Sequence, residues 1–140
     1  MRRALTIWHP DLFLSIHHAS VPDNLKEPWQ YGGKKNYYSY RFSGYAIFVS
    51  NDNADRAGSL AFGHWLSQEL QKRGLHYAPH YSLPVMGRFR HELVDPEAGV
   101  YRYDHLIVLQ STFIPAVLLE AGASACPAAH TWGCAAKRLA

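Results

Sequence analysis

Apolar and polar residues alternate along the chain in a way that predicts several strands and one long helix. Four short, mostly apolar stretches predict strands, at residues 11–16, 44–50, 105–109 and 115–119, and the first of them is typical of a strand that is covered on both faces. Over residues 54–73, apolar residues recur at three- and four-residue spacing, which predicts an amphipathic helix. The order strand, strand, helix, strand, strand favours an α/β fold of three layers, with a mixed, partly parallel sheet flanked by helices.

The predicted helix has start and stop signals at its two ends. Residues 51–53 (Asn-Asp-Asn) provide turn and N-cap chemistry, and Arg73 with Gly74 provides a basic last turn and a C-cap. We expect one apolar face, made by Ala57, Leu60, Ala61, Trp65, Leu66 and Leu70.

Two segments lack a clear periodicity. Residues 21–41 are rich in Pro, Gly, Lys, Asn and Tyr, and loops of this length within a compact domain tend to be functional. Residues 76–104 are interrupted by several prolines and glycines and are expected to be irregular. The aromatic residues of the first segment either line a sugar-binding groove or cover a neighbouring apolar surface: Trp29, Tyr31, Tyr37, Tyr38 and Tyr40.

Composition narrows the class of protein. The chain has 140 residues, which is the size of one domain, and it is 48% hydrophobic and 18% charged, as is ordinary for a globular protein. The formal charge is only +3, and no basic run is dense enough to suggest nucleic-acid binding. The apolar stretches are too short to span a membrane. Polar residues interrupt the apolar run near the N-terminus, so we expect no export signal in this chain.

Two cysteines, Cys126 and Cys134, lie close together near the C-terminus. They could form a disulfide, bind a metal together with His130, or remain free thiols. Their spacing fits none of the common zinc-finger patterns, so free thiols are the default expectation.

Two candidate chemical groups each follow an apolar stretch. His17 follows residues 11–16, and Glu120 follows residues 115–119. Ligands of open α/β sheets gather beyond the carboxyl ends of parallel strands, so parallel neighbouring strands would turn the imidazole and the carboxylate towards one crevice. A histidine-bound zinc ion polarises a carbonyl, and a nearby carboxylate takes a proton from water. The alternative is that both residues merely mark the ends of strands.

The stretches around these two residues resemble a known enzyme family. DLFLSIHHAS is similar to the segment of zinc-dependent N-acetylmuramoyl-L-alanine amidases in which an apolar strand ends in Ser-Ile-His. YDHLIVLQSTFIPAVLLEAG resembles that family's later stretch, which carries the catalytic glutamate. The helix at residues 54–73 and the GVYRYD stretch at 99–104 fit in order and spacing, so the resemblance covers roughly residues 11–122.

The resemblance implies a function, a cofactor and a location. The family hydrolyses the amide between the lactyl group of N-acetylmuramic acid and L-alanine in peptidoglycan, and it works in the cell envelope. His17 matches a zinc-ligating histidine and Glu120 matches the catalytic glutamate, which deprotonates the attacking water while zinc polarises the scissile carbonyl. Residues 1–122 would then be a partial catalytic domain that binds zinc and a muropeptide. His18 has no role that the resemblance assigns.

The chain departs from the family pattern at both ends. The family's zinc is held by two histidines and a glutamate, and two of these ligands precede the Ser-Ile-His motif by a good margin. Here the sixteen residues before His17 include His9 but no glutamate and no glycine. We therefore expect an N-terminally truncated domain without two zinc ligands, with an exposed sheet edge and a tendency to self-associate. Residues 123–140 have no clear periodicity and are interpreted as an atypical tail, with an out-of-frame or recombined origin as the hypothesis.

Other interpretations remain open at the level of sequence. Replacement metal ligands could come from the irregular segment, although the spacing of its polar residues favours none of them: His80, His91, Glu92, Asp95 and Glu97. The truncated chain could be an inactive fragment or a non-catalytic wall-binding module that uses the aromatic segment. A related zinc amidohydrolase or peptidase is a further alternative.

Overall fold

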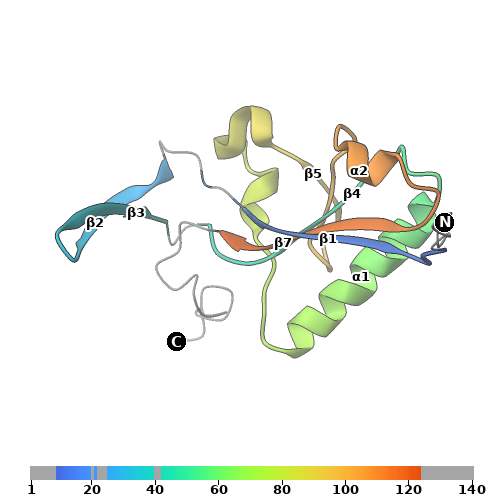
Figure 1. The fold of residues 1–140 in the computed structure, drawn as a ribbon, viewed down its shortest axis with the longest axis horizontal. Coiled ribbons are helices and arrows are strands. Elements are labelled where there is room, and N and C mark those ends of the chain that lie inside the picture. The colour runs from blue at the N-terminus through green and yellow to red at the C-terminus, as the bar shows by residue number, and fades with distance from the viewer. Residues whose placement is uncertain (1–8, 20, 22–24, 40–41, 124–140) are drawn as a thin grey trace, which may run out of the picture.

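The computed structural model describes residues 9–19, 21, 25–39 and 42–123. These residues form a five-stranded sheet with helices on its faces and a separate two-stranded ribbon (Figure 1). The elements, in chain order, are β1 (Phe13–Ala19), β2 (Glu27–Tyr31), β3 (Lys34–Tyr38), β4 (Ala46–Val49), α1 (Arg56–Lys72), the 3₁₀ helices η2 (Pro79–Ser82) and η3 (Pro84–Phe89), β5 (Glu92–Asp95), β6 (Val100–Arg102), α2 (Ile107–Gln110) and β7 (Ala116–Ala123).

The sheet is mixed, with the strand order β1-β7-β4-β6-β5. β1 is parallel to β7 and β4 is parallel to β6, whereas the β7–β4 and β6–β5 pairs are antiparallel. This arrangement confirms the predicted α/β fold with a partly parallel sheet. It also places the first and last of the described strands, β1 and β7, side by side at one edge of the sheet.

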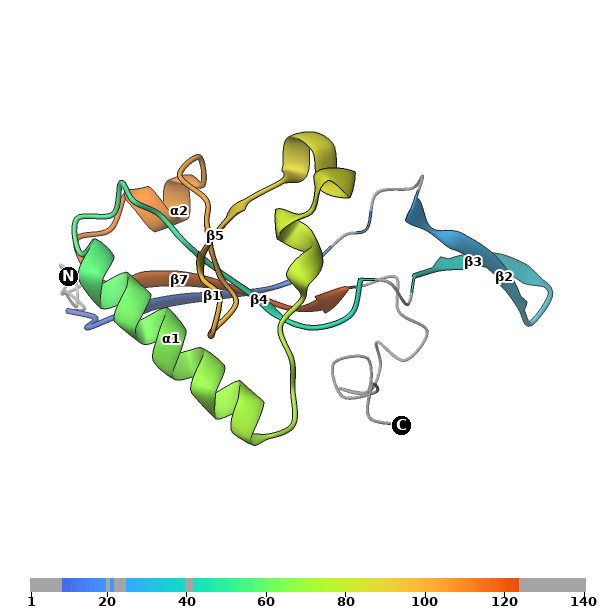
Figure 2. The ribbon, with the colours of Figure 1, turned by 180° about the vertical axis from the view of Figure 1, so that it is seen from behind.

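Each face of the sheet has its own apolar core. On one face α1 covers a cluster that includes Ile47, Val49, Val100 and Val117. The helices α2 and η2 lie on the opposite face, which we call the cavity face (Figure 2). There they cover a cluster around Phe48. The strand β4 is buried along its whole length because it contributes side chains to both clusters. Among the described residues, no helix is long and apolar enough to cross a membrane.

The helix α1 lies where its periodicity predicts, but its cap and its buried face differ from the prediction. Asp55 is the N-cap, and its side chain accepts a hydrogen bond from the backbone N–H of Gly58 at 2.9 Å. Asn53 does not cap the helix. Its Nδ2 instead donates to the backbone oxygen of Leu109 at 2.7 Å and ties the loop to α2.

Small residues make the contact between α1 and the sheet. Ser59, Gly63 and Ser67 are the buried positions of the helix, whereas the predicted apolar positions Ala57, Ala61 and Trp65 are exposed. The predicted face was therefore wrong at these three residues, although Leu60, Leu66 and Leu70 do pack against the core. The helix lies close to the strands, and only small side chains fit between the two backbones.

The prediction of a strand at residues 105–109 was wrong, because Ile107–Gln110 form the single helical turn α2. A short apolar run suits either a strand or a buried helical turn, and here the chain buries Leu106 and Leu109 at a helical spacing of three. Ile107 and Val108 are left exposed at 70% and 42%.

The two segments without periodicity contain strands. Residues 21–41 include the antiparallel ribbon β2–β3, whose turn is made by Gly32 and Gly33 at positive φ. The ribbon extends away from the sheet in both ribbon views (Figures 1 and 2). Residues 76–104 contain β5, β6 and the two 3₁₀ helices, so this segment is not irregular throughout.

Candidate functional site

The sheet brings the two predicted site residues together. His17 of β1 is the registered partner of Glu120 of β7, and the two strands are parallel neighbours. This meets the condition under which the sequence predicts a shared crevice. The sequence predicts that the first strand ends at residue 16, before His17. This was wrong, because β1 keeps pairing with β7 through His17 and ends at Ala19, after a shift in register. The prediction that this strand is covered on both faces was also wrong, since β1 is an edge strand of the described sheet and Ile16 is 62% exposed.

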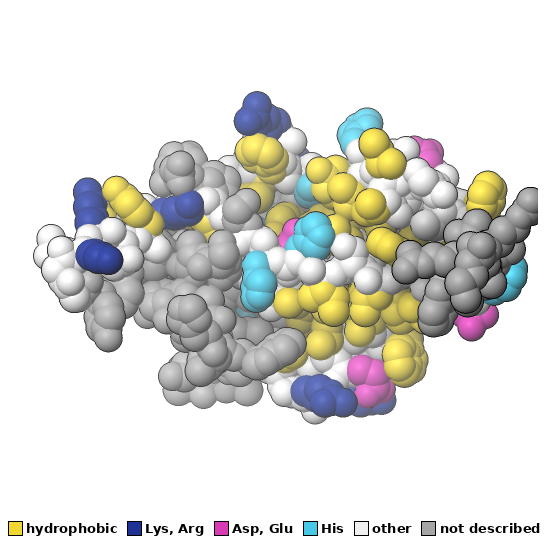
Figure 3. All heavy atoms as spheres, viewed as in Figure 1, with side chains coloured by type: hydrophobic (Ala, Val, Ile, Leu, Met, Phe, Trp, Pro, Cys, Tyr) yellow, Lys and Arg dark blue, Asp and Glu magenta, His cyan; other side chains and the backbone are white. Residues whose placement is uncertain are grey.

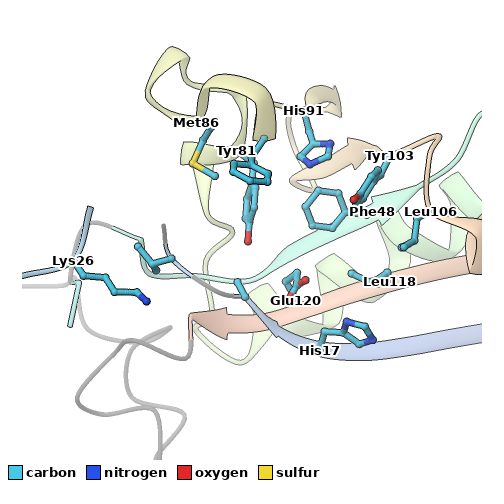
Figure 4. Close-up of a pocket in the computed structure, with 13 residues that line it drawn as sticks. His17, Lys26, Phe48, Tyr81, Met86, His91, Tyr103, Leu106, Leu118 and Glu120 are labelled. Atoms are coloured by element: carbon cyan, nitrogen blue, oxygen red, sulfur yellow. The ribbon is translucent and has the colours of Figure 1, made fainter. Parts of the chain in front are cut away.

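Both residues line a cavity on the cavity face of the sheet. The cavity has a volume of about 550 Å³ and lies between the strands and the η2–η3 segment (Figure 4). We call it the central cavity. Its walls are formed by His17, Ala19, Val21, Lys26, Phe48, Tyr81, Met86, Phe89, His91, Tyr103, Leu106, Leu118 and Glu120.

Glu120 is the acidic group of the central cavity. Its Oε2 atom is buried, and it has no hydrogen-bond partner among the described residues. Burial raises the pKa of the Glu120 carboxyl, and the charges of His17 and His18 oppose that rise. A half-buried carboxylate with a raised pKa and an unused oxygen is suited to take a proton from water and return it.

His17 lies on the open side of the cavity. Its side chain is exposed, and its Nε2 atom is 3.1 Å from the hydroxyl oxygen of Ser15. Ser15 precedes it on the same face of β1, so the hydroxyl holds the imidazole by a local contact. His18 is exposed as well and does not line the cavity.

A group of aromatic residues covers the other side of the central cavity. The rings of Tyr81, His91 and Tyr103 surround Phe48, with centroid distances of 5.2, 5.0 and 5.9 Å to its ring. The hydroxyl of Tyr81 points towards Glu120 (Figure 4). Burial first, and then the charge of Glu120, raises the pKa of Tyr81. Sequence reasoning missed Tyr81 and Tyr103 because they belong to the segment without periodicity.

His91 joins the site although its spacing in the sequence does not favour it. Its Nδ1–H donates to the backbone oxygen of Arg102 at 3.1 Å, so the neutral ring keeps an unprotonated Nε2. Burial lowers the pKa of His91, which favours this neutral form.

The other candidate ligands from residues 76–104 do not enter the cavity. His80 is buried against the rings of Phe42 and Tyr81. Glu92 forms an ion pair with Arg102 at 2.7 Å, and Asp95 contacts His64 at 2.6 Å. Glu97 is exposed beyond β5.

The described residues do not by themselves make up a zinc site. Catalytic zinc takes three protein ligands and an open position for water. No group of three or more His, Cys, Asp or Glu side chains in this part of the chain could hold a metal ion. His17 can offer one nitrogen beside Glu120, so the remaining ligands would have to come from outside the described residues. Cys126, His130 and Cys134 lie in the undescribed segment 124–140.

Comparison with models of known protein families and with curated proteins found no match.

Proposed function

We propose that the chain acts on peptidoglycan as an N-acetylmuramoyl-L-alanine amidase, with Glu120 as its general base. The observation that supports this most is the buried, unpartnered Oε2 of Glu120 in a cavity that also contains His17. The resemblance of the sequence around both residues supports the choice of substrate, which is the amide between the lactyl group of muramic acid and L-alanine.

In this proposal Glu120 moves protons during hydrolysis. It takes a proton from the water that attacks the scissile carbonyl and then passes that proton to the leaving amino group of L-alanine. Its raised pKa makes the carboxylate a stronger base than an exposed glutamate. The Tyr81 hydroxyl, which faces Glu120, is placed to contact the polar atoms of the substrate near the scissile bond.

Zinc is the proposed cofactor, and His17 is its proposed ligand from the described residues. Bound zinc would polarise the scissile carbonyl and lower the pKa of water. The described residues do not complete its coordination, so the proposal requires further ligands from outside them. The resemblance of the sequence to zinc-dependent amidases also supports the cell envelope as the place where the chain acts.

A second candidate function is non-catalytic binding to the wall. The β2–β3 ribbon extends from the sheet and carries Tyr37, which is 54% exposed, and the amino group of Lys35 lies 5.5 Å from the centre of the Tyr37 ring. An exposed aromatic ring is a suitable platform for a sugar ring. This candidate would use the ribbon rather than Glu120.

Metal dependence separates the two candidates. A purified muropeptide is incubated with the chain, either with added zinc or with a chelator, and the products are analysed by mass spectrometry. An amidase releases a peptide that begins with L-alanine only when zinc is present. A binding module leaves the muropeptide intact and binds it equally under both conditions. Cleavage of plain peptides at a similar rate would instead favour a general zinc peptidase.

The histidine pair provides a matched control for the role of His17. We expect His17→Ala to abolish the effect of zinc and His18→Ala to retain it, because only His17 lines the central cavity. Equal effects of the two substitutions would contradict the assignment of His17 as the ligand.

A further inference from the structure

A second cavity adjoins the central cavity and has a different charge. It has a volume of about 450 Å³ and lies where β6 ends and β5 begins. Phe89, His91 and Tyr103 line both cavities and form a shared wall. We call the second one the basic cavity. Its remaining lining residues are Arg88, Arg90, Glu92, Arg102, Asp104 and His105.

The two acidic residues of the basic cavity are already paired. Arg102 contacts Glu92 through Nη1 at 2.7 Å and Asp104 through Nε at 3.2 Å. Asp104 also accepts a hydrogen bond from the backbone N–H of Asn51 at 2.8 Å. These contacts direct both carboxylates towards Arg102, so neither carboxylate neutralises the positive charge of the other two arginines that line the cavity.

Arg88 and Arg90 are the arginines with binding capacity left. The guanidinium of Arg88 stacks at 4.8 Å on the ring of Phe89, and Arg90 donates its Nε–H to the backbone oxygen of Ser82 at 2.7 Å. Neither forms an ion pair with a carboxylate in the part of the chain that the structure describes. A guanidinium has five N–H donors, so each can still bind a planar anion through two parallel hydrogen bonds.

We propose that the basic cavity binds a peptide carboxylate of the substrate, and that it thereby orients the substrate across Glu120. This inference rests on the proposed function. Once its lactyl carboxyl is tied up in the amide, the N-acetylmuramic acid half carries no charge, whereas the peptide half carries free carboxylates. The anionic peptide therefore lies over the wall of His91 and Tyr103 and into the basic cavity, and the glycan leaves the central cavity on the other side.

The test compares two muropeptides that differ only in whether the peptide carboxyl groups are free or converted to carboxamides. Their dissociation constants are measured by calorimetry with a chelator present, so that hydrolysis does not interfere. The proteins are the wild-type chain, the double variant Arg88→Gln/Arg90→Gln, and Arg73→Gln. Arg73 is an exposed arginine at the C-cap of α1, outside both cavities, and controls for the loss of a positive surface charge away from them.

We expect the wild-type chain and Arg73→Gln to bind the free-carboxylate form about tenfold more tightly than the carboxamide form, as for a charge-assisted hydrogen bond at a partly open site. The double variant should bind both forms about equally, with the affinity of the wild-type chain for the carboxamide form. Both arginines are exposed, so thermal unfolding of the double variant should match that of the wild type.

The other outcomes overturn the inference in distinguishable ways. Equal binding of both forms by the wild type, or an unchanged preference in the double variant, would overturn the basic cavity as a carboxylate site while the proposed function stands. Binding of inorganic phosphate as tight as that of the muropeptide would assign the cavity to a free anion. If neither muropeptide binds the wild-type chain, the proposed function is overturned as well.

Discussion

At the scale of single residues, the burial of Glu120 determines both its chemistry and its energetic cost. The carboxylate keeps a buried oxygen without a partner in the described structure, and burial raises its pKa. Ionisation of such a group opposes folding, because the unfolded chain ionises it more readily. The buried carboxylate of Glu120 therefore lowers the stability of the folded chain at a pH where it is ionised.

This cost predicts how Glu120→Gln affects stability. Because the folded pKa is raised, stability is highest below the ordinary pKa of glutamate and falls as the pH rises through the folded value. Thermal unfolding at pH 7 should therefore show a higher Tm for Glu120→Gln than for the wild type, and the difference should shrink at pH 4. Glu97→Gln, which changes an exposed carboxylate, should leave the Tm unchanged. A lower Tm for Glu120→Gln at pH 7 would contradict the burial argument.

The burial of His80 predicts the opposite pH dependence of folding stability. Burial lowers the pKa of His80 to about 4, so its contribution to stability is full above the ordinary pKa of histidine and is lost as the pH falls towards 4. The loss between pH 7 and pH 4 amounts to at most about 3 kcal/mol of unfolding free energy.

Denaturant unfolding at several pH values measures this contribution. His80→Gln should lose less stability on acidification than the wild type, whatever its stability at pH 7. The exposed His105→Gln should show the wild-type dependence on pH. Parallel curves for His80→Gln and the wild type would show that His80 is not the buried titrating group.

At the scale of elements, the close contact between α1 and the sheet depends on Gly63. A Cβ atom at this position would lie 3.2 Å from Cγ2 of Ile47 and 3.4 Å from a methyl group of Val100. A larger side chain there would push the helix away from both strands. We expect Gly63→Leu to reduce the free energy of unfolding by about 1–3 kcal/mol. Ala61→Leu, on the exposed face, should change it by less than about 0.5 kcal/mol. Equal effects in denaturant unfolding would contradict the observed helix face.

The elements also show what the sequence can predict. Periodicity predicted α1 and the buried strands β4 and β7. A long periodic pattern or a uniformly apolar run indicates the type of element whatever its tertiary contacts are. It did not predict the buried face of α1, since Ser59, Gly63 and Ser67 are buried for their small size rather than their apolarity. It also missed β5 and β6, which are four and three residues long and are formed by pairing with distant segments.

The same distinction applies to the candidate site. His17 and Glu120 could be found because each follows an apolar run, and the observed register places them side by side. Tyr81 and Tyr103 could not be found, and His91 could not be told apart from the other polar residues of its segment, because only the tertiary packing of η2, β5 and β6 brings the three rings over Phe48. The zinc-binding role of His17 and the catalytic role of Glu120 remain predictions.

At the scale of the whole molecule, β1 is one of the two edge strands of the described sheet. It pairs with β7 on one side, and Leu12 and Ile16 are exposed at 47% and 62%. Figure 3 shows hydrophobic side chains gathered in the middle of the face that carries β1, next to histidine side chains. Exposed edges with apolar residues pair readily with other chains.

This edge predicts self-association in solution. In sedimentation velocity, the apparent mass of the wild-type chain should rise with concentration, and Ile16→Lys should reduce that rise because it places a charge on the edge. Ile107→Lys is the matched control, since Ile107 is 70% exposed on α2 and does not belong to a strand of the sheet. A monomer at every concentration would contradict the prediction, and so would an equal effect of both substitutions.

The proposed function is tested most directly by whether Glu120 is required for hydrolysis of the lactyl–L-alanine amide. Muropeptide is incubated with the zinc-supplemented chain, and mass spectrometry follows the release of the peptide that begins with L-alanine. We expect release by the wild type and by Glu97→Gln, and a loss of at least about a hundredfold in Glu120→Gln, as for the removal of a general base. Release at the wild-type rate by Glu120→Gln, or no release by the wild-type chain, would contradict the proposed function.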